Sequence, residues 1–561
     1  MSDHVKVFAL GGLDEEGRDC YVVEINDDIF VLDCGMSLPD KTLPGIDALI
    51  PNFEYLIRNK SRIKAYIITH GHDEEIGALK FFYDFAPAPI YCTPMTKEFM
   101  ESQAVLHKIK TSFKFQMVEP TSQHVIAGRE VRFFQTCHNM AFSFGVAIWT
   151  DKGYVVYTSD FIVDFTVKYS AFKFDLKALA EISEKPTLLL MSESKCAALD
   201  GFCAPHHRTY NRLEKYFYED KRIFLTCFWE NVYRIREFFD LAETFHKKVY
   251  LYDEYTKNCI DFMTQKLDFT IKKDTIVSSS ELLRVRSSDV VIFMLGHNED
   301  IYTEIENIAM GRNEDKRIAL NENDIFVIGA IPTDIYEVHA TKCIDSLYRT
   351  NCEVVWLKRK DVPAMHARKD DLKFFLSVLR PKYYLPVRGI YTDLLDNAKL
   401  ALSMGIGLNH SNVIVLDNGM QIEFGDTPRP ILIPNEENKI AIAPILVDGT
   451  GISKVGDEVI NDRIKLGVDG VVVIVSTVSR KEKRIIAGPD CQMRGFVYVK
   501  EAEPLLKAVS QTYVEEVTNA LKEGVEDFEA LQDDIKEKAR KSIRKDNGRE
   551  PLIIVSIIPI D

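Results

Sequence analysis

The residues best suited to chemistry are concentrated in one short segment, Thr69-His70-Gly71-His72-Asp73-Glu74-Glu75. It follows an apolar run over residues 63–69 that has the composition of a buried strand. A strand that ends in His-x-His presents both imidazoles at its carboxyl edge, where a metal ion can be held. An isolated histidine is most often structural, but two histidines followed at once by three carboxylates predict a metal site.

Short apolar and β-branched runs, bounded by Gly, Asp or Pro, indicate the strands that position this segment. They occupy residues 5–10, 20–25, 28–34, 63–69 and 131–136. Apolar residues at helical spacing predict surface helices over residues 47–59 and 95–107. Early strands come as hairpins, and strands alternate with helices after about residue 172. This order is typical of a layered α/β sandwich with its helices outside.

The sequence changes character twice more along the chain. Between residues 208 and 361, apolar strands alternate with helices, as expected of a doubly wound parallel domain. Hairpin-like strands return after residue 387, which indicates one domain interrupted by another. A third composition begins near residue 447 and contains two long helices.

Composition limits the class of protein. The 561 residues carry a net charge of −15, which argues against a surface coated with basic groups for non-specific nucleic-acid binding. No stretch approaches the roughly 18 apolar residues of a membrane span, and no signal peptide is apparent. Eleven cysteines without a C-x-x-C pair indicate free thiols in a reducing compartment. We therefore expect a cytoplasmic protein of several domains without a membrane partner.

Further motifs follow in a specific order. They are Leu10-Gly11-Gly12, Thr136-Cys137-His138, Tyr157-Thr158-Ser159-Asp160, Leu190-Met191-Ser192-Glu193-Ser194, Asp448-Gly449-Thr450-Gly451 and Arg494-Gly495-Phe496-Val497-Tyr498-Val499. Together with the histidine segment, this series resembles the ribonuclease J family, in the β-CASP branch of the metallo-β-lactamase superfamily. That superfamily has the signature H-x-H-x-D-H. The similarity runs from about residue 5 to the end of the chain.

The resemblance implies an α/β fold with a metallo-β-lactamase αββα sandwich, interrupted by a doubly wound β-CASP domain. A small α+β C-terminal domain follows. We expect the sandwich to comprise residues 1–207 and 369–447, and the β-CASP domain residues 208–368. A linker and the C-terminal domain would then occupy residues 448–561.

The resemblance also implies a metal-ligand set. The residues that match ligands of the family's first site are His70, His72, His138 and Asp160. Three imidazoles and a carboxylate suit Zn²⁺, with Mn²⁺ or Mg²⁺ as alternatives.

The second metal site departs from the family pattern at every side chain unique to it. The signature aspartate is Glu74, the final histidine is Glu75, and the histidine of a late P-V-H-G sequence is Arg388. Arginine cannot coordinate a cation because it stays protonated. We therefore expect one ion per chain instead of two.

Three residues are candidates for catalysis by this resemblance: Glu74, Asp160 and His366. In the family, two ions activate a hydroxide and polarise the scissile phosphate. His366 matches a β-CASP histidine that faces the substrate phosphate, and Asn231 lies in a loop that contacts RNA. Arg388 either supplies part of the missing ion's charge and attracts a phosphate, or only pairs with Glu74 or Glu75 in an inert pocket. The implied substrate-binding set is Asn231, His366 and Arg388.

The resemblance predicts a ribonuclease J-like protein that acts on single-stranded RNA, in processing and in mRNA decay. Its 5′→3′ exonuclease and endonuclease-type hydrolysis would be weakened by the loss of the second metal site. The alternative is a catalytically inactive RNA-binding or structural subunit that partners an active ribonuclease J. Either role is compatible with a homo- or hetero-oligomer. A metallohydrolase for small esters is a third reading, which the inserted and C-terminal domains disfavour.

Overall fold

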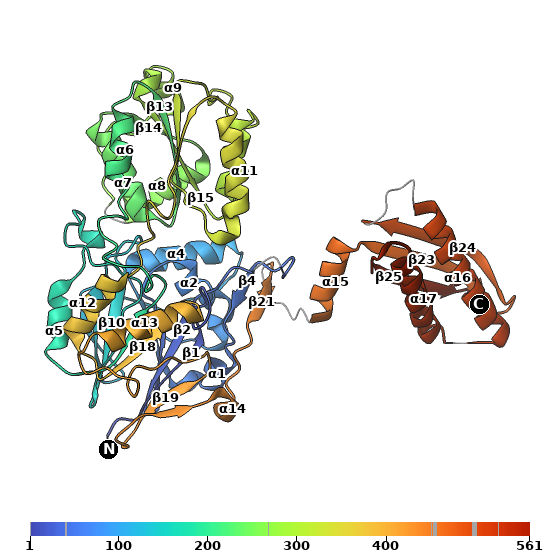
Figure 1. Ribbon diagram of the computed structural model, residues 1–561, viewed down its shortest axis with the longest axis horizontal. Helices are drawn as coiled ribbons and strands as arrows, with labels where there is room; N and C mark the ends of the chain where they lie inside the picture. The colour runs from blue at the N-terminus through green and yellow to red at the C-terminus, as the bar shows by residue number, and fades with distance from the viewer. Residues whose placement is uncertain are drawn as a thin grey trace. The chain divides into compact units, whose positions relative to one another are not determined.

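The computed structural model describes residues 2–39, 42–266, 269–449, 451–452, 457–495, 502–525 and 527–560 (Figure 1). The chain divides into two compact units. The first consists of Met1–Leu38 with Ala48–Ile445, and the second of Pro39–Asp47 with Leu446–Asp561. None of the described helices is long and apolar enough to span a membrane.

The first unit is built on two stacked sheets. The eight-stranded sheet has the order β20-β19-β1-β2-β3-β5-β6-β7. Its strands are β1 (Val5–Gly11), β2 (Cys20–Ile25), β3 (Asp28–Leu32), β5 (Ile63–Ile67), β6 (Ile90–Cys92), β7 (Phe115–Met117), β19 (Gln421–Phe424) and β20 (Ile431–Ile433). A strand β4 (Ala48–Ile50) and the short helices α1 (Glu54–Arg58), α2 (Asp73–Ile76) and α3 (Leu79–Phe82) lie between these strands in sequence.

The six-stranded sheet has the order β18-β12-β11-β10-β9-β8. Its strands are β8 (Gln123–Ile126), β9 (Arg129–Gln135), β10 (Phe144–Thr150), β11 (Gly153–Tyr157), β12 (Thr187–Glu193) and β18 (Tyr383–Val387). Apolar side chains of both sheets, such as Val23, Val146 and Leu385, form one core between them. Helices α5 (Leu176–Ser183), α12 (Lys369–Leu379) and α13 (Tyr391–Ser403) cover the outer face of this sheet (Figure 1).

The insertion lies between β12 and β18. These strands pair in parallel, from Leu189 beside Tyr383 to Glu193 beside Val387. The whole inserted domain lies between them in sequence. The inserted sheet is parallel throughout, in the order β14-β15-β13-β16-β17. Its strands are β13 (Arg222–Phe228), β14 (Lys248–Leu251), β15 (Val290–Gly296), β16 (Asp324–Ile328) and β17 (Glu353–Trp356).

Helices lie on both faces of the inserted sheet, as a doubly wound domain requires. Figure 1 shows α6 (Tyr210–Phe217) and α7 (Val232–Thr244) on one side and α11 (Glu337–Tyr348) on the other. The remaining helices of this domain are α8 (Glu254–Lys266), α9 (Ser279–Leu282) and α10 (Asp300–Ala309). The sandwich interrupted by a parallel α/β domain is therefore confirmed, while the domain boundaries given above stay predictions.

The second unit contains a three-stranded sheet of order β24-β23-β25. It comprises β23 (Val471–Ser479), β24 (Arg484–Arg494) and β25 (Leu552–Pro559), packed on α16 (Ala502–Glu523) and α17 (Glu529–Asn547). Helix α15 (Asp457–Val468) precedes this sheet. The α+β character expected of the C-terminal domain is confirmed. Thr450 and residues 496–499, which contributed to two sequence motifs, lie outside the described residues.

The helix predicted over residues 47–59 is wrong at its start. Residues Ala48–Ile50 form strand β4, and the helix α1 begins only at Glu54. Pro51 explains the difference, because the residue before a proline is driven out of the α conformation toward extended backbone.

The histidine segment is clamped by the turn that follows β3. Cys34 N–H donates to Glu75 O at 2.7 Å, and Met36 N–H donates to Asp73 O at 2.9 Å. Gly35 lies between them, and a Cβ there would come within 1.4 Å of the Glu74 carbonyl oxygen. Only glycine therefore allows this turn to approach helix α2, which carries Glu74 and Glu75.

We expect Gly35→Ala to lower the free energy of unfolding by about 3 kcal/mol or more, because the added methyl must displace backbone in a packed region. Chemical denaturation of the full chain measures this. Gly425→Ala is the control, since its Cβ would meet only the ring of the half-exposed His4, at 3.2 Å. Equal unfolding midpoints for the two variants would contradict the clamp.

Candidate metal centre

Strand ends of both sheets converge on one buried site. His70 and His72 follow β5, His138 follows β9, and Asp160 follows β11. Asp33 fixes the start of the histidine segment, because its carboxylate accepts hydrogen bonds from the Thr69 N–H at 2.8 Å and the Tyr157 hydroxyl at 2.9 Å. These hydrogen bonds tie the ends of strands from both sheets together beneath the site.

His70, His72, His138 and Asp160 offer one ligand atom each, all within 4.8 Å of one another. The His72 Nδ1 lies 3.0 Å from His70 Nε2 and 3.4 Å from His138 Nε2. The His138 Nε2 lies 3.4 Å from Asp160 Oδ2. Ligands held about 2.0–2.1 Å from a tetrahedral zinc ion are separated by roughly 3.3 Å, so these spacings fit a bound ion.

The protonation state of these groups also suits a metal. Burial lowers the pKa of His70 and His138 well below the usual value, and lowers that of His72 to about 4. The imidazoles are therefore neutral near pH 7 and keep a lone pair for a cation. His138 Nδ1 lies 2.8 Å from the Met365 carbonyl oxygen, to which it can donate, leaving Nε2 for the metal. The Asp160 Oδ2 atom is buried without a hydrogen-bond partner, as expected of a carboxylate built to bind a cation.

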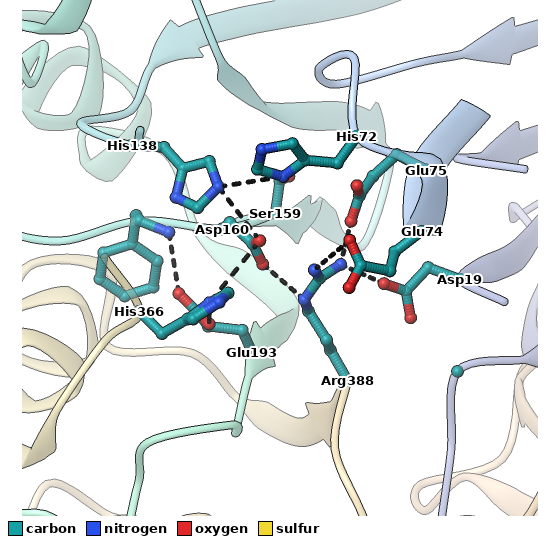
Figure 2. A network of polar contacts seen from close by, with 12 residues as sticks. Asp19, His72, Glu74, Glu75, His138, Ser159, Asp160, Glu193, His366 and Arg388 are labelled. Atoms are coloured by element: carbon teal, nitrogen blue, oxygen red, sulfur yellow. Dashed lines mark hydrogen bonds and ion pairs between the residues drawn. The ribbon is translucent and has the colours of Figure 1, made fainter. Parts of the chain in front are cut away.

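Arg388 lies among the acidic side chains of the pocket (Figure 2). Its Nε is 2.7 Å from Asp160 Oδ1, its Nη1 forms ion pairs with Asp19 and Glu75, and its Nη2 is 4.0 Å from Glu74. The guanidinium therefore places a positive charge among the buried carboxylates of this pocket. The residues His70, His72, His138 and Asp160 fit a bound metal ion.

Burial makes this cluster strongly dependent on its cation. The Asp19 and Glu75 side chains are completely buried, and the Arg388 side chain is 5% exposed. Burial raises the pKa of both carboxyl groups, which the Arg388 charge opposes. The sequence offered no reason to select Asp19, because it is 369 positions away from Arg388.

The side chains of His366 and Glu193 form an acid–imidazole pair next to Asp160. The His366 Nδ1 is 2.8 Å from Glu193 Oε2 and 3.6 Å from Asp160 Oδ2. The other Glu193 oxygen accepts hydrogen bonds from the Phe161 and Ala367 N–H groups, at 2.8 and 3.0 Å. Burial raises the pKa of Glu193 to about 7 and lowers that of His366 to about 4. Glu193 thus holds His366 in one orientation. Glu193 belongs to one of the sequence motifs, but that motif did not indicate its contact with His366.

Two side chains of the loop after β13, the candidate RNA-contact residue Asn231 and its neighbour Trp229, make contacts within the protein. Asn231 caps helix α7 by accepting a hydrogen bond from the Arg234 N–H at 3.0 Å. Trp229 stacks on Phe99 of α4 (Pro94–Leu106), with ring centroids 4.5 Å apart. Phe99 also packs against the histidine segment, since a Cβ on Gly71 would lie 3.0 Å from its ring. The structure brings His366 and Arg388 to the metal ligands, and it gives the Asn231 side chain a helix-capping contact.

Three family models match the chain in the same order as its domains. The metallo-beta-lactamase superfamily matches residues 13–130, the ribonuclease J beta-CASP domain residues 220–347, and the ribonuclease J C-terminal domain residues 458–560. Proteins named Ribonuclease J 2 from Staphylococcus epidermidis and Staphylococcus saprophyticus are 28% and 27% identical over 99% of this chain and 98% of their own length. The chain belongs to the ribonuclease J family.

A solved structure shares this ribonuclease J-family fold. It is a protein of unknown function from Enterococcus faecalis V583, with a TM-score of 0.51 and 14% identity. The match covers 75% of this chain and all of that one, and at this identity it supports the fold alone.

We expect this ribonuclease J-family chain to retain about one zinc or manganese ion after dialysis, because one ligand set is complete. Elemental analysis by mass spectrometry gives the stoichiometry. His138→Ala should release the ion, whereas His124→Ala, on strand β8, should retain it. Two ions per wild-type chain would contradict the assignment of Arg388 to the second position.

We expect Arg388→Met to cost about 3–5 kcal/mol of unfolding free energy at neutral pH, because it leaves Asp19 and Glu75 buried without a cation. Denaturant titration measures the loss. Arg58→Met is the control, since the Arg58 side chain is 73% exposed and its surface ion pair contributes about 1 kcal/mol or less. The double variant Asp19→Asn, Arg388→Met should regain part of the loss. An Arg388→Met protein as stable as the control would show that the buried charges are compensated elsewhere.

Proposed function

We propose that this chain is a ribonuclease J-like protein of RNA processing and mRNA decay that hydrolyses phosphodiester bonds slowly with one metal ion. One observation carries the proposal: the ligand atoms of His70, His72, His138 and Asp160 lie together, while Arg388, which replaces a histidine of the family pattern, pairs with Asp160. The substrate is single-stranded RNA, and the reaction is 5′→3′ exonucleolytic or endonucleolytic cleavage.

In this proposal, His70, His72, His138 and Asp160 hold a single Zn²⁺, Mn²⁺ or Mg²⁺ ion. When bound, such an ion lowers the pKa of water and polarises a phosphoryl oxygen. The imidazole-rich donor set favours zinc or manganese over magnesium, which prefers oxygen ligands.

His366 acts on the substrate side of this ion. Its Nδ1 faces the Glu193 carboxylate and can donate to it, so its Nε2 keeps the lone pair. Because burial lowers the pKa of His366 to about 4, the ring is neutral at pH 7 and can accept a hydrogen bond from a reacting group, although it is a weak base. Glu193 serves as the positioning residue, because it sets the tautomer and the orientation of the ring.

Glu74 is a weak base in this pocket. Its side chain is 36% exposed, and although burial alone would raise its pKa, Lys195 and Arg388 lower it to about 2. A carboxylate with this pKa orients an attacking water more readily than it removes the proton. The missing metal clamp costs several kcal/mol of transition-state stabilisation as well, about a thousandfold or more in rate.

The cellular compartment and the partner of the protein follow from the same proposal. We infer a cytoplasmic protein, supported by eleven cysteines that are all free in the structure. We also infer assembly with a second copy or with another ribonuclease J, one whose two metal sites are complete. Such a partner would supply the faster hydrolysis.

The test is decay of a 5′-monophosphorylated single-stranded RNA by the zinc- or manganese-loaded full chain. We expect cleavage about a thousandfold slower than that of a ribonuclease J with both metal sites, because one metal clamp is absent. His70→Ala should abolish the cleavage and His124→Ala should not. RNA binding without His70-dependent cleavage would replace the hydrolase with a binding subunit, and absence of both would overturn the RNA-related function.

A further inference from the structure

Lys195 follows strand β12 and Arg388 follows strand β18, so both residues lie at the carboxyl ends of neighbouring strands. Strands β12 and β18 run in parallel and end side by side, and the Ser194 N–H donates to the Arg388 carbonyl oxygen at 3.0 Å. The Ser194 hydroxyl also donates to the Val387 carbonyl oxygen at 2.9 Å. The Asn397 amide ties this turn down by donating to the Glu193 carbonyl oxygen at 2.9 Å. The backbone that carries Lys195 is therefore fixed against the strand that carries Arg388.

Among the residues that the structure describes, the ammonium group of Lys195 has no hydrogen-bond or ion-pair partner. In the part of the chain that the structure describes, no carboxylate oxygen lies within 4 Å of it, although its side chain is half-buried. Its electrostatic neighbours are Glu74, Glu16 and Asp160, together with Arg388. Burial alone would lower the pKa of Lys195, but these carboxylates raise it above the usual value, so the group is charged at neutral pH.

The two cationic side chains of the pocket, Arg388 and Lys195, differ in burial and in their contacts with carboxylates. Arg388 is 5% exposed and contacts three carboxylates through Nε and Nη1. Lys195 is less deeply buried and carries three N–H donors, and it contacts no carboxylate in the described part of the chain. A partly buried ammonium without a paired anion has lost hydration that nothing in the described residues restores. An anion that enters this pocket would restore it.

We propose that Lys195 is the phosphate-binding cation of this site, contacting a non-bridging oxygen of the RNA phosphodiester beside the metal ligands. In this division, Arg388 neutralises the buried carboxylates and Lys195 meets the substrate. The inference rests on the proposed function, because it takes the ligand to be an RNA phosphate.

The charge of the pocket makes this cation necessary. Asp19, Glu74, Glu75, Asp160 and Glu193 bring five carboxyl groups to the site. A single divalent ion and Arg388 together carry three positive charges, so a phosphate would meet an excess of negative charge wherever those carboxyl groups are ionised. Lys195 reduces this excess on the side of the pocket where Glu74 is exposed.

The first experiment measures binding of a single-stranded RNA to the metal-loaded full chain by fluorescence anisotropy across a series of salt concentrations. Lys195→Ala should weaken binding about tenfold and reduce the slope of log affinity against log salt by about one, as expected for one lost phosphate contact. Lys195→Arg should keep most of the affinity, because it restores the charge. Lys373→Ala is the control, since Lys373 lies on helix α12 and pairs with Asp370 at 2.9 Å.

The second experiment uses inorganic phosphate and no RNA, so it separates this inference from the proposed function. Phosphate should raise the unfolding temperature of the metal-loaded wild type, Lys195→Arg and Lys373→Ala proteins, and should raise that of Lys195→Ala much less. Phosphate binding that depends on Lys195, without any RNA binding, would keep the anion site and overturn the RNA function. Wild-type RNA binding with an unchanged affinity and salt slope in Lys195→Ala would overturn the role of Lys195 and leave the proposed function intact.

Discussion

The ion cluster around Arg388 is the interaction on which the rest of the site depends. A guanidinium at 5% exposure contacts Asp19, Glu75 and Asp160, which come from three separate segments of the chain. Removing charges of this kind from water is expensive, so the cluster is stable only while every member keeps its partner. The arginine thereby holds these three segments of the chain together. Unlike a metal ion, it cannot coordinate the oxygen of a water molecule and so lower the pKa of that water.

The topology of the sandwich makes this cluster possible. Arg388 follows β18, and β18 pairs with β12 only because the chain returns to the six-stranded sheet after the inserted domain. The insertion thus separates two neighbouring strands in sequence while leaving them adjacent in space. As a result, Glu193, Lys195 and Arg388 share one edge, next to the Asp160 that follows β11.

The inserted domain also meets the metal site directly. The Phe99 ring packs against Gly71, which lies between His70 and His72. Trp229 of the inserted domain stacks on the same Phe99 ring, with ring centroids 4.5 Å apart. The Trp229 Nε1 lies 3.2 Å from His297 Nδ1, which brings together the loops that follow β13 and β15. Aromatic stacking therefore couples the position of the inserted domain to the backbone that carries two metal ligands.

Through its resemblance to the ribonuclease J family, the sequence predicted the order of the domains and a first ligand set, and the arginine at position 388 excluded that side chain as a metal ligand. These predictions depend on short motifs and on the family that they resemble, and both can be recognised without knowing where the residues lie in the fold. The partnership of Asp19 with Arg388, the support of His366 by Glu193 and the unpaired state of Lys195 were decided only by the tertiary structure. The reason is physical: burial and charge pairing depend on which strand ends meet. Residues 19 and 388 meet only because β1, β2 and β18 belong to two sheets stacked on one core.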